Sequence, residues 1–354
     1  MANNNLTNAK KAKNDEFYTQ YNDIEKEINA YLEYNPKVFK DKVILLPCDD
    51  PEWSNFTKFF SQNFERLGIK KLISTSYAAE SKTFKSDFQP TLFESENIIF
   101  DKEKTTKNGK IFTLTTDKTG EGKTDVKDLE WKYLKGDGDF RSEEIKKLRD
   151  EADIIITNPP FSLFREFLTW ITEAQKQFVV VGNKNCVTYK EIFPLFKENK
   201  MWSGETEWGG GMWFETKDSG DVDKTINGID MKNVSSVWFT NIDHGRRHRP
   251  LPLMTIDDNL KYSKHKEIKG KDSYDKYDNY DAIEVPFTDS IPSDYEGIMG
   301  VPISFLDKYS PEQFEIIGCS YNYGRPESWD KNIDMGVSVK GVNVFKRILI
   351  RRKR

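Results

Sequence analysis

The stretch ADIIITNPPFSLFREFLTW, residues 152–170, carries the pattern that decides the fold. Its first half is a short apolar run of the kind that forms a fully buried strand. Its second half repeats apolar residues at three- and four-residue steps, as an amphipathic helix does. Asn158, Pro159, Pro160 and Phe161 stand between the two halves. A buried strand that leads directly into a helix is the repeating unit of a parallel α/β sheet, so this class is the first prediction.

The same alternation of strand and helix recurs along the first part of the chain. Strands are expected at 42–47, 70–77, 153–157 and 177–183, and helices at 51–68, 142–152 and 161–175. Gly68 marks the end of the first helix, and Ser142 is the expected N-cap of the second. These elements predict a doubly wound, mostly parallel sheet.

Two segments depart from that alternation. The residues from about 80 to 130 predict a β-rich insertion with antiparallel strands. Its expected strands are 97–100 and 110–116, with a polar turn at 102–109. Farther along, 210–216 and 235–241 predict a terminal antiparallel hairpin that completes the sheet.

The chain is longer than one hydrophobic core usually organises, since it has 354 residues,. We expect a larger domain of residues 1–243 and a smaller C-terminal region of residues 244–354. The boundary is placed where the basic cluster GRRHRP, 245–250, follows the last of the alternating elements. A Lys-, Tyr- and Asp-rich stretch, 269–282, is expected to form an exposed loop.

Composition narrows the class of protein. Aromatic residues make up 13% of the chain and charged residues 32%, which suits a polar globular protein,. The net charge of −4 excludes general attraction to nucleic acid, so any such binding needs a local patch such as 245–250 or 347–354,. The alternative for each patch is a solvated surface run.

The three cysteines form no CxxC pair, which argues against a disulfide framework or a zinc site,. The absence of a long apolar segment or signal peptide predicts a soluble cytoplasmic protein with no membrane contact.

The tetrapeptide at the strand end has the groups needed to hold a planar amine. The Asn158 side-chain oxygen and the Pro159 carbonyl are two acceptors for the amine hydrogens, and Pro160 stiffens the turn. Phe161 offers a flat face on which a base would stack, which suits an extruded nucleobase. The alternative is a plain strand-to-helix turn.

Longer stretches of the chain point to a known group of enzymes. The sequence resembles the EcoRI-type family of adenine-specific DNA methyltransferases nearly end to end. The matching stretches are NDEFYTQ (14–20), CDDPEWSNF (48–56), KKLISTSY (70–77), GDGDFRS (136–142), ADIIITNPPFSLFREF (152–167), VVGNKN (180–185), YKEIFPLFKENK (189–200), GGMWF (210–214), WFTNIDH (238–244), YDNYDAIEV (277–285) and MGVPISFLDKYSPEQFEI (299–316).

The resemblance implies a methyltransferase fold of the class I, S-adenosylmethionine-dependent type in the larger domain. It also implies transfer of a methyl group from S-adenosylmethionine to the exocyclic amine of a flipped adenine in double-stranded DNA. The C-terminal region would then recognise the DNA target. The enzyme would act either in a restriction-modification system, with a separate cognate endonuclease, or as an orphan methylase. The sequence predicts neither the recognition site nor the oligomeric state.

The resemblance assigns the first part of the cofactor site. Tyr18 and Thr19 would contact the methionine end of the cofactor, with Asp49 and Asp50 at the end of the first strand. The glycine-rich turn usual in such enzymes is replaced here by Cys48-Asp49-Asp50-Pro51. The alternatives are a core position for Tyr18 and a helix-capping role for the two aspartates.

The same resemblance assigns the adenine end of the cofactor to another loop. Asp139 would accept a hydrogen bond from the adenine amine, and Phe140 would pack on the adenine ring. The alternative is that Asp137 and Asp139 are ordinary turn residues of a GDGD loop.

For DNA, the basic cluster supplies the candidate phosphate contacts. Arg246, Arg247, His248 and Arg249 follow an expected strand and would clamp phosphates, which gives affinity without sequence information. The histidines lack metal-ligand spacing, and methyl transfer needs no metal.

Two other functions fit the same motif. One is a related methyltransferase acting on RNA, cytosine or a protein amide. The other is a catalytically silent DNA-binding regulator.

Overall fold

The chain folds into two compact units. The computed structural model describes residues 18–49, 54–78, 100–216, 222–330 and 336–353. The first unit contains the chain up to residue 184 together with 204–244, and the second contains 185–203 and the chain from 245. Nothing in the sequence pattern indicated that 185–203 would group with the C-terminal residues. Within the described ranges, no helix has the length and apolar character to cross a membrane.

A large mixed sheet forms the centre of the first unit. Its strands lie in the order β5 (Glu130–Tyr133), β4 (Lys110–Leu114), β3 (Lys71–Thr75), β2 (Val43–Leu46), β6 (Ile154–Thr157), β7 (Gln177–Asn183) and β12 (Ser236–Thr240). The four central strands β3, β2, β6 and β7 are parallel, whereas β4, β5 and β12 are antiparallel to their neighbours. The predicted α/β class and its four parallel strands are confirmed.

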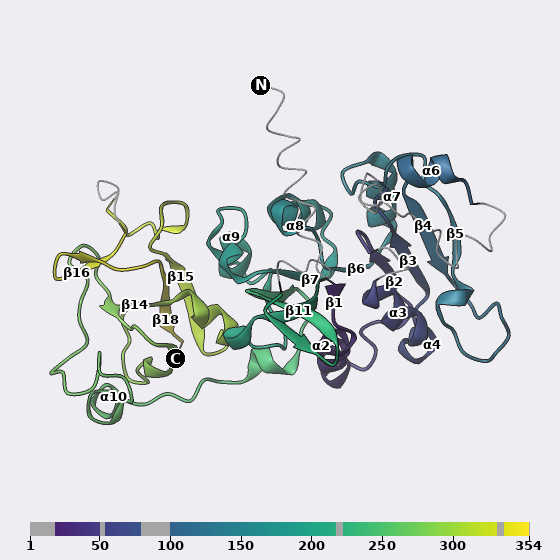
Figure 1. Ribbon diagram of the computed structural model, residues 1–354. Helices are drawn as coiled ribbons and strands as arrows, with labels where there is room; N and C mark the ends of the chain where they lie inside the picture. Colours follow the sequence, from purple (N-terminus) through teal and green to yellow (C-terminus); the bar gives the residue numbers. More distant parts are fainter. Residues whose placement is uncertain (1–17, 50–53, 79–99, 217–221, 331–335, 354) are drawn as a thin grey trace, which may run out of the picture. The chain divides into compact units, whose positions relative to one another are not determined.

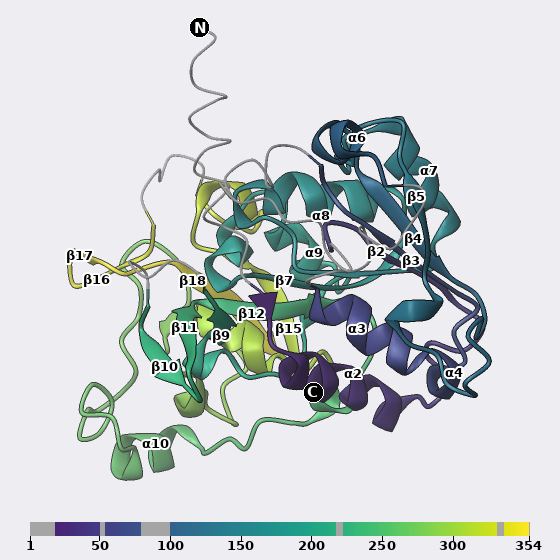
Figure 2. The same cartoon turned by 45° about the vertical axis from the view of Figure 1, so that its right-hand side comes forward.

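Helices cover both faces of this sheet. In Figures 1 and 2, α2 (Tyr21–Tyr34) and α3 (Asn55–Gln62) lie on one side, and α7 (Glu143–Glu151) and α8 (Phe164–Glu173) lie on the other. Successive strand residues point to opposite faces, so a strand between two helical layers must be apolar throughout. All four residues of β2 and of β6 are buried accordingly.

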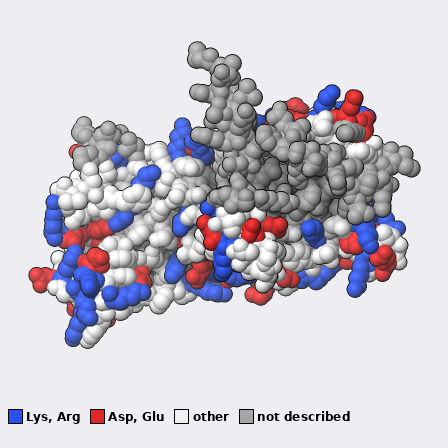
Figure 3. All heavy atoms as spheres, viewed as in Figure 1, with Lys and Arg blue, Asp and Glu red and all other residues white. Residues whose placement is uncertain are grey.

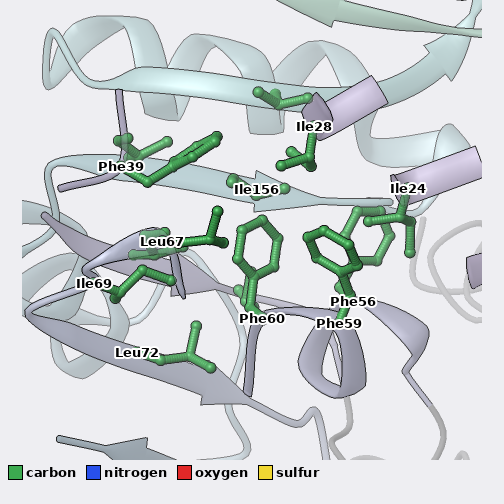
Figure 4. Packing of buried hydrophobic residues seen from close by; sticks show 14 of the residues in the cluster. Ile24, Ile28, Phe39, Phe56, Phe59, Phe60, Leu67, Ile69, Leu72 and Ile156 are labelled. Carbon is green, nitrogen blue, oxygen red and sulfur yellow. The ribbon is translucent and has the colours of Figure 1, made fainter. Parts of the chain in front are cut away.

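The core under α2 and α3 is built largely from aromatic rings. Phe56, Phe59 and Phe60 of α3 and Ile24 and Ile28 of α2 are buried in one cluster with the strand residues beneath them. Figure 4 shows these side chains converging on the face of the sheet that carries Ile156. The aromatic spacing seen in the sequence is thus the buried stripe of a helix.

The helix expected at 51–68 is interrupted. Helix α3 ends at Gln62, and a short helix, α4 (Phe64–Leu67), continues to Gly68, which ends it as predicted. The Asn63 side chain donates a 2.8 Å hydrogen bond to the Phe59 carbonyl at the break. In α7, the predicted N-cap is confirmed, because the Ser142 hydroxyl accepts from the Ile145 amide.

One prediction about the less regular segments is wrong. The residues expected as a polar turn at 102–109 form a helix, α6 (Lys102–Lys107), because the Asp101 carboxylate accepts from two amides of its first turn. The antiparallel strand expected at 110–116 is confirmed by β4, which extends the central sheet together with β5. Residues 97–99 of the other expected strand lie outside the described ranges.

The predicted hairpin of 210–216 and 235–241 is also wrong. Strand β12 pairs with β7, whereas β9 (Met212–Glu215) lies in a second sheet of order β1 (Tyr18–Thr19), β9, β11 (Ile229–Val234), β10 (Lys224–Ile226). The burial patterns give the reason. Every residue of β12 is buried, as a strand covered on both faces requires, whereas β9 alternates between buried and half-buried residues,.

The second unit is organised around a four-stranded sheet. Its order is β13 (Ile283–Glu284), β14 (Met299–Pro302), β18 (Arg347–Arg352), β15 (Phe314–Cys319). The same unit contains the short strands β8 (Trp202–Ser203), β16 (Ser338–Val339) and β17 (Val342–Asn343) and the helices α9 (Phe193–Lys197) and α10 (Ile256–Tyr262). The basic C-terminal run is an inner strand, since Ile348, Leu349 and Ile350 are fully buried. The stretch expected as an exposed loop buries Tyr274 and Tyr277.

A buried carboxylate ties α2 to the loop at residues 204–206. Glu27 is fully buried, and its Oε1 accepts from the Tyr31 hydroxyl at 2.6 Å and from the Glu205 amide at 2.9 Å. Burial raises the pKa of Glu27 despite these hydrogen bonds. Gly204 has no room for a side chain, because a Cβ there would overlap Glu27 Oε1 and lie 2.7 Å from the Trp238 Cβ.

We expect Gly204→Ala to lower the free energy of unfolding by about 2 kcal/mol, since the added methyl group forces the packed Glu27 and Trp238 apart. Gly209→Ala is the matched control, because a Cβ at Gly209 meets no atom within 4 Å. Urea unfolding of both variants measures the difference. Equal stability of the two variants would contradict the close packing at Gly204.

Candidate active site

The carboxyl ends of β2 and β6 meet at the centre of the sheet. From β2 the chain passes to β3 on one side and later returns to β6 on the other, so the connections diverge between these two strands. In open α/β sheets, ligands bind at this switch point. The Thr157 hydroxyl donates to the Pro47 carbonyl at 2.5 Å and joins the two strand ends. Cys48 follows with a left-handed φ of 69°, a conformation that glycine adopts at lower cost,.

The Asn-Pro-Pro-Phe segment begins directly after β6. Asn158 is half-buried and Pro159 is buried, and a 3-10 turn, η3 (Phe161–Leu163), leads into α8. Phe161 is half-buried, and its ring meets Phe214 of β9 edge-on, with centroids 6.5 Å apart. The motif therefore lies at the switch point, with an aromatic partner from another sheet.

Strand β9 also brings the N-terminal segment to this site. Phe214 is fully buried and is the register partner of Thr19 in β1. The Asn55 side chain donates to the Thr19 carbonyl at 2.8 Å, which ties β1 to the start of α3. Thr19 Oγ1 is buried and makes no hydrogen bond within the described residues. Sequence reasoning missed Phe214 and Asn55, although both lie in stretches that carried the family resemblance.

Of the two aspartates expected at the end of the first strand, the structure describes only Asp49. Asp49 is buried, and its Oδ1 accepts from the Ser54 hydroxyl at 2.9 Å. Ser54, not Asp49, is the N-cap of α3, because its Oγ accepts from the Phe56 amide. Asp50 lies outside the described residues, and Tyr18 is placed only by its backbone pairing with Glu215.

The GDGD loop lies against the end of β3. Gly138 has a φ of 87°, and a side chain there would overlap the Ser76 carbonyl oxygen. Asp139 is held by Arg141, whose Nε and Nη2 donate to its two carboxylate oxygens at 2.9 and 2.5 Å. Burial acts to raise the pKa of Asp139, but the hydrogen bonds and charge of Arg141 outweigh it and lower that pKa.

Phe140, the next residue in this loop, belongs to the core. It is 4% exposed and meets Phe167 and Trp170 edge-on at centroid distances of 5.1 and 5.6 Å. The cofactor contacts assigned to Asp139 and Phe140 remain predictions, and Arg141 is the neighbour that sequence reasoning missed.

The basic cluster lies in the second unit, in a 3-10 turn, η6 (Gly245–His248). Arg246 donates to Asp307 at 2.7 Å, and the two side chains are only 11% and 7% exposed. His248 Nδ1 lies 2.7 Å from a Glu312 carboxylate oxygen. Arg249 is exposed.

The remaining arginine of this cluster also packs within the second unit. The Arg247 guanidinium lies 3.6 Å from the centroid of the Trp202 ring and donates to Asn199 at 2.5 Å. Among the described parts of the chain, no group of His, Cys, Asp and Glu side chains is arranged to hold a metal ion.

Comparison with known proteins identifies the group to which this arrangement belongs. The sequence matches the family described as "Adenine-specific methyltransferase EcoRI" over residues 5–353. The chain belongs to this family. It is an adenine-specific methyltransferase of the EcoRI type, as the resemblance implied.

Three relatives match the EcoRI-type chain over nearly its whole length. Type II methyltransferase M.EcoRI of Escherichia coli is 41% identical, over 99% of this chain and 96% of its own. Type II methyltransferase M.MpnI of Mycoplasma pneumoniae is 33% identical, over 98% and 97%. Type II methyltransferase M.MgeORF184P of Mycoplasma genitalium is 32% identical, over 98% of each chain. Comparison with solved structures gives no match.

Phe214→Leu should slow methyl transfer in this EcoRI-type enzyme by about tenfold, because Phe161 loses the ring that sets its orientation. Phe59→Leu is the matched control, since Phe59 is equally buried in the same core but lies in α3. Single-turnover transfer to unmethylated DNA, with thermal unfolding of each variant, separates orientation from stability. Equal slowing in both variants would show that Phe214 acts through stability alone.

Proposed function

We propose that this protein transfers the methyl group of S-adenosylmethionine to the exocyclic N6 of an adenine in double-stranded DNA, as the modification enzyme of a restriction-modification system or as an orphan methylase. The observation that carries the proposal is the position of Asn158–Phe161, which begins at the carboxyl end of β6 beside the end of β2. A switch point is where such a sheet binds its ligands. The central sheet would then be that of a class I methyltransferase.

Different residues of the motif would make different contacts with the base. The Asn158 side-chain oxygen and the Pro159 carbonyl accept the two amine hydrogens, which reduces delocalisation of the nitrogen lone pair into the ring and directs it toward an electrophile. Phe161 stacks on the base, and Phe214 holds that ring in place. The cofactor supplies an electrophilic methyl group. A nitrogen–carbon bond forms as the sulfur–carbon bond breaks, and the amine proton leaves to solvent after alkylation.

The groups at the switch point suit an amino-acid-bearing sulfonium ligand. The buried Thr19 Oγ1 makes no hydrogen bond within the described chain, and it can bond to the methionine end. The Asp49 carboxylate offers negative charge at the end of β2, complementary to the cofactor's positive centre. Tyr18, Asp50, Asp139 and Phe140 keep the roles that the resemblance assigns to them.

Duplex DNA would bring its target adenine to the motif by base flipping. In the basic cluster Arg249 is the best phosphate contact, because it is exposed and no ion pair of Arg249 is found within the described residues. The other members of the cluster, Arg246, Arg247 and His248, already contact Asp307, Trp202 and Glu312. They would contact phosphate while keeping these partners, or would instead hold the turn that presents Arg249. In a restriction-modification system, a separate cognate endonuclease would act beside this enzyme.

Asn158→Ala is expected to slow methyl transfer by roughly a thousandfold, because one acceptor of the amine hydrogens is lost. Transfer of labelled methyl groups to DNA from a methylation-free host gives the rate, and calorimetry with S-adenosylmethionine shows that cofactor binding persists. Asn35→Ala, at an exposed amide beyond α2, is the control and should leave the rate unchanged. Retained turnover in Asn158→Ala would refute the assigned role.

Arg249→Ala and Arg246→Ala should behave differently. The first should weaken binding to all DNA sequences alike and reduce the salt slope by about one, as the loss of a phosphate contact does. The second should lower the free energy of unfolding by about 3 kcal/mol, since it leaves Asp307 buried without its ion-pair partner. Anisotropy titrations at several salt concentrations and urea unfolding measure the two effects. An unchanged slope for Arg249→Ala would remove Arg249 from the phosphate footprint.

A further inference from the structure

A second surface of the C-terminal unit has the properties of a nucleic-acid contact. It consists of the β16–β17 hairpin, Ser338–Asn343, and the turn that follows at 344–346. Phe345 is 70% exposed and Val342 is 69% exposed, the highest values among the large hydrophobic residues of the described chain. Single exposed apolar residues are common on protein surfaces, so the case for a contact rests on how these two are held and on the charge beside them.

The hairpin is held rigidly by one carboxylate. Asp278 accepts from the Lys340 amide at 3.0 Å, from the Gly341 amide at 2.8 Å and from the Ser338 hydroxyl at 3.0 Å. Lys340 and Gly341 both have positive φ, 52° and 76°, as a two-residue turn of the I′ type requires,. A preorganised hairpin loses little conformational entropy when it binds a partner.

A buried ion pair supports the turn that displays Phe345. Arg347 donates to Glu284 through Nε and Nη2 at 2.6 to 3.1 Å, and the two side chains are 12% and 10% exposed. Arg347 Nη1 also donates to the Phe345 carbonyl at 3.1 Å. The Tyr277 hydroxyl donates to the same Glu284 carboxylate. The backbone of Phe345 is therefore fixed from below while its ring stays in solvent.

One cation of this turn is not paired with a carboxylate of the described residues. Lys340 of the hairpin pairs with Asp275 at 2.8 Å and Arg347 pairs with Glu284, which leaves Lys346. Lys346 makes no ion pair within the described part of the chain, and its ammonium group lies 5.3 Å from the centroid of the Tyr321 ring. Tyr323, 44% exposed, meets Tyr321 edge-on at 5.2 Å. Aromatic rings beside an unpaired cation are typical of nucleic-acid contacts.

We propose that the β16–β17 hairpin and the Phe345–Lys346 turn contact duplex DNA, with Phe345 against the faces of sugars and bases and Lys346 against a phosphate. This inference rests on the proposed function only in naming DNA as the partner. A second copy of the chain fits this surface poorly, because a symmetric contact would bring the Lys346 ammonium groups of the two copies together. An apolar side chain flanked by cations is also what minor-groove contacts use.

The test uses the full chain and a labelled duplex of mixed sequence, with binding followed by fluorescence anisotropy at several salt concentrations. Phe345→Ala should weaken binding by about tenfold with an unchanged salt slope, because stacking carries no charge. Lys346→Ala should weaken binding and lower the slope by about one. Tyr262→Ala is the matched control, since Tyr262 is 60% exposed on α10 of the same unit, and it should bind as the parent does.

Parental affinity in both Phe345→Ala and Lys346→Ala would overturn the proposal, as would an equal loss in Tyr262→Ala. Sedimentation of the parent and of Phe345→Ala tests the rival partner, because a change of oligomeric state on losing the ring would assign the surface to a second copy of the chain. Methyl transfer by the parent is measured separately. A parent that binds DNA through this hairpin yet transfers no methyl group would refute the proposed function and leave the surface assignment standing.

Discussion

The parallel pairing of β2 with β6 is the constraint on which the rest of the first unit depends. Both strands are buried along their whole length, so their pairing lies at the centre of the sheet with helices covering both faces,. The pairing puts the end of β2 and the Asn158–Phe161 segment at one edge, and the Thr157 to Pro47 hydrogen bond joins them. The Asn158–Phe161 segment is thereby fixed at the edge of the sheet.

A second sheet completes that edge from residues far apart in sequence. Strand β1 comes from the start of the chain and β9 from beyond residue 210, and their pairing places Thr19 beside Phe214, whose ring meets Phe161. The site therefore depends on two sheets, one of which supplies the motif and the other its aromatic support. The edge-on contact sets the orientation of the Phe161 ring,.

Three arginines of the second unit are engaged by other side chains of that unit. Arg246 with Asp307 and Arg347 with Glu284 are buried pairs, and Arg247 stacks on Trp202. Arginine suits this use because its planar fork bonds a carboxylate and stacks on a ring at once. On the face drawn in Figure 3, blue and red side chains of this unit are interspersed. The positions of Lys and Arg in the sequence therefore do not show by themselves where the surface is positively charged.

Local patterns in the sequence were enough for the α/β class, the four parallel strands, Gly68, the Ser142 cap and the position of Asn158–Phe161, because periodicity and capping act over a few residues. The resemblance identified the family. Which elements and side chains lie next to each other could be seen only in the tertiary structure. Strand β12 pairs with β7 instead of β9, Phe214 lies beside Phe161, and Arg141 binds Asp139. The basic run near the C-terminus is an inner strand. Strand pairing and ion pairing join residues far apart in the chain, and their energies depend on burial, which a single sequence does not display.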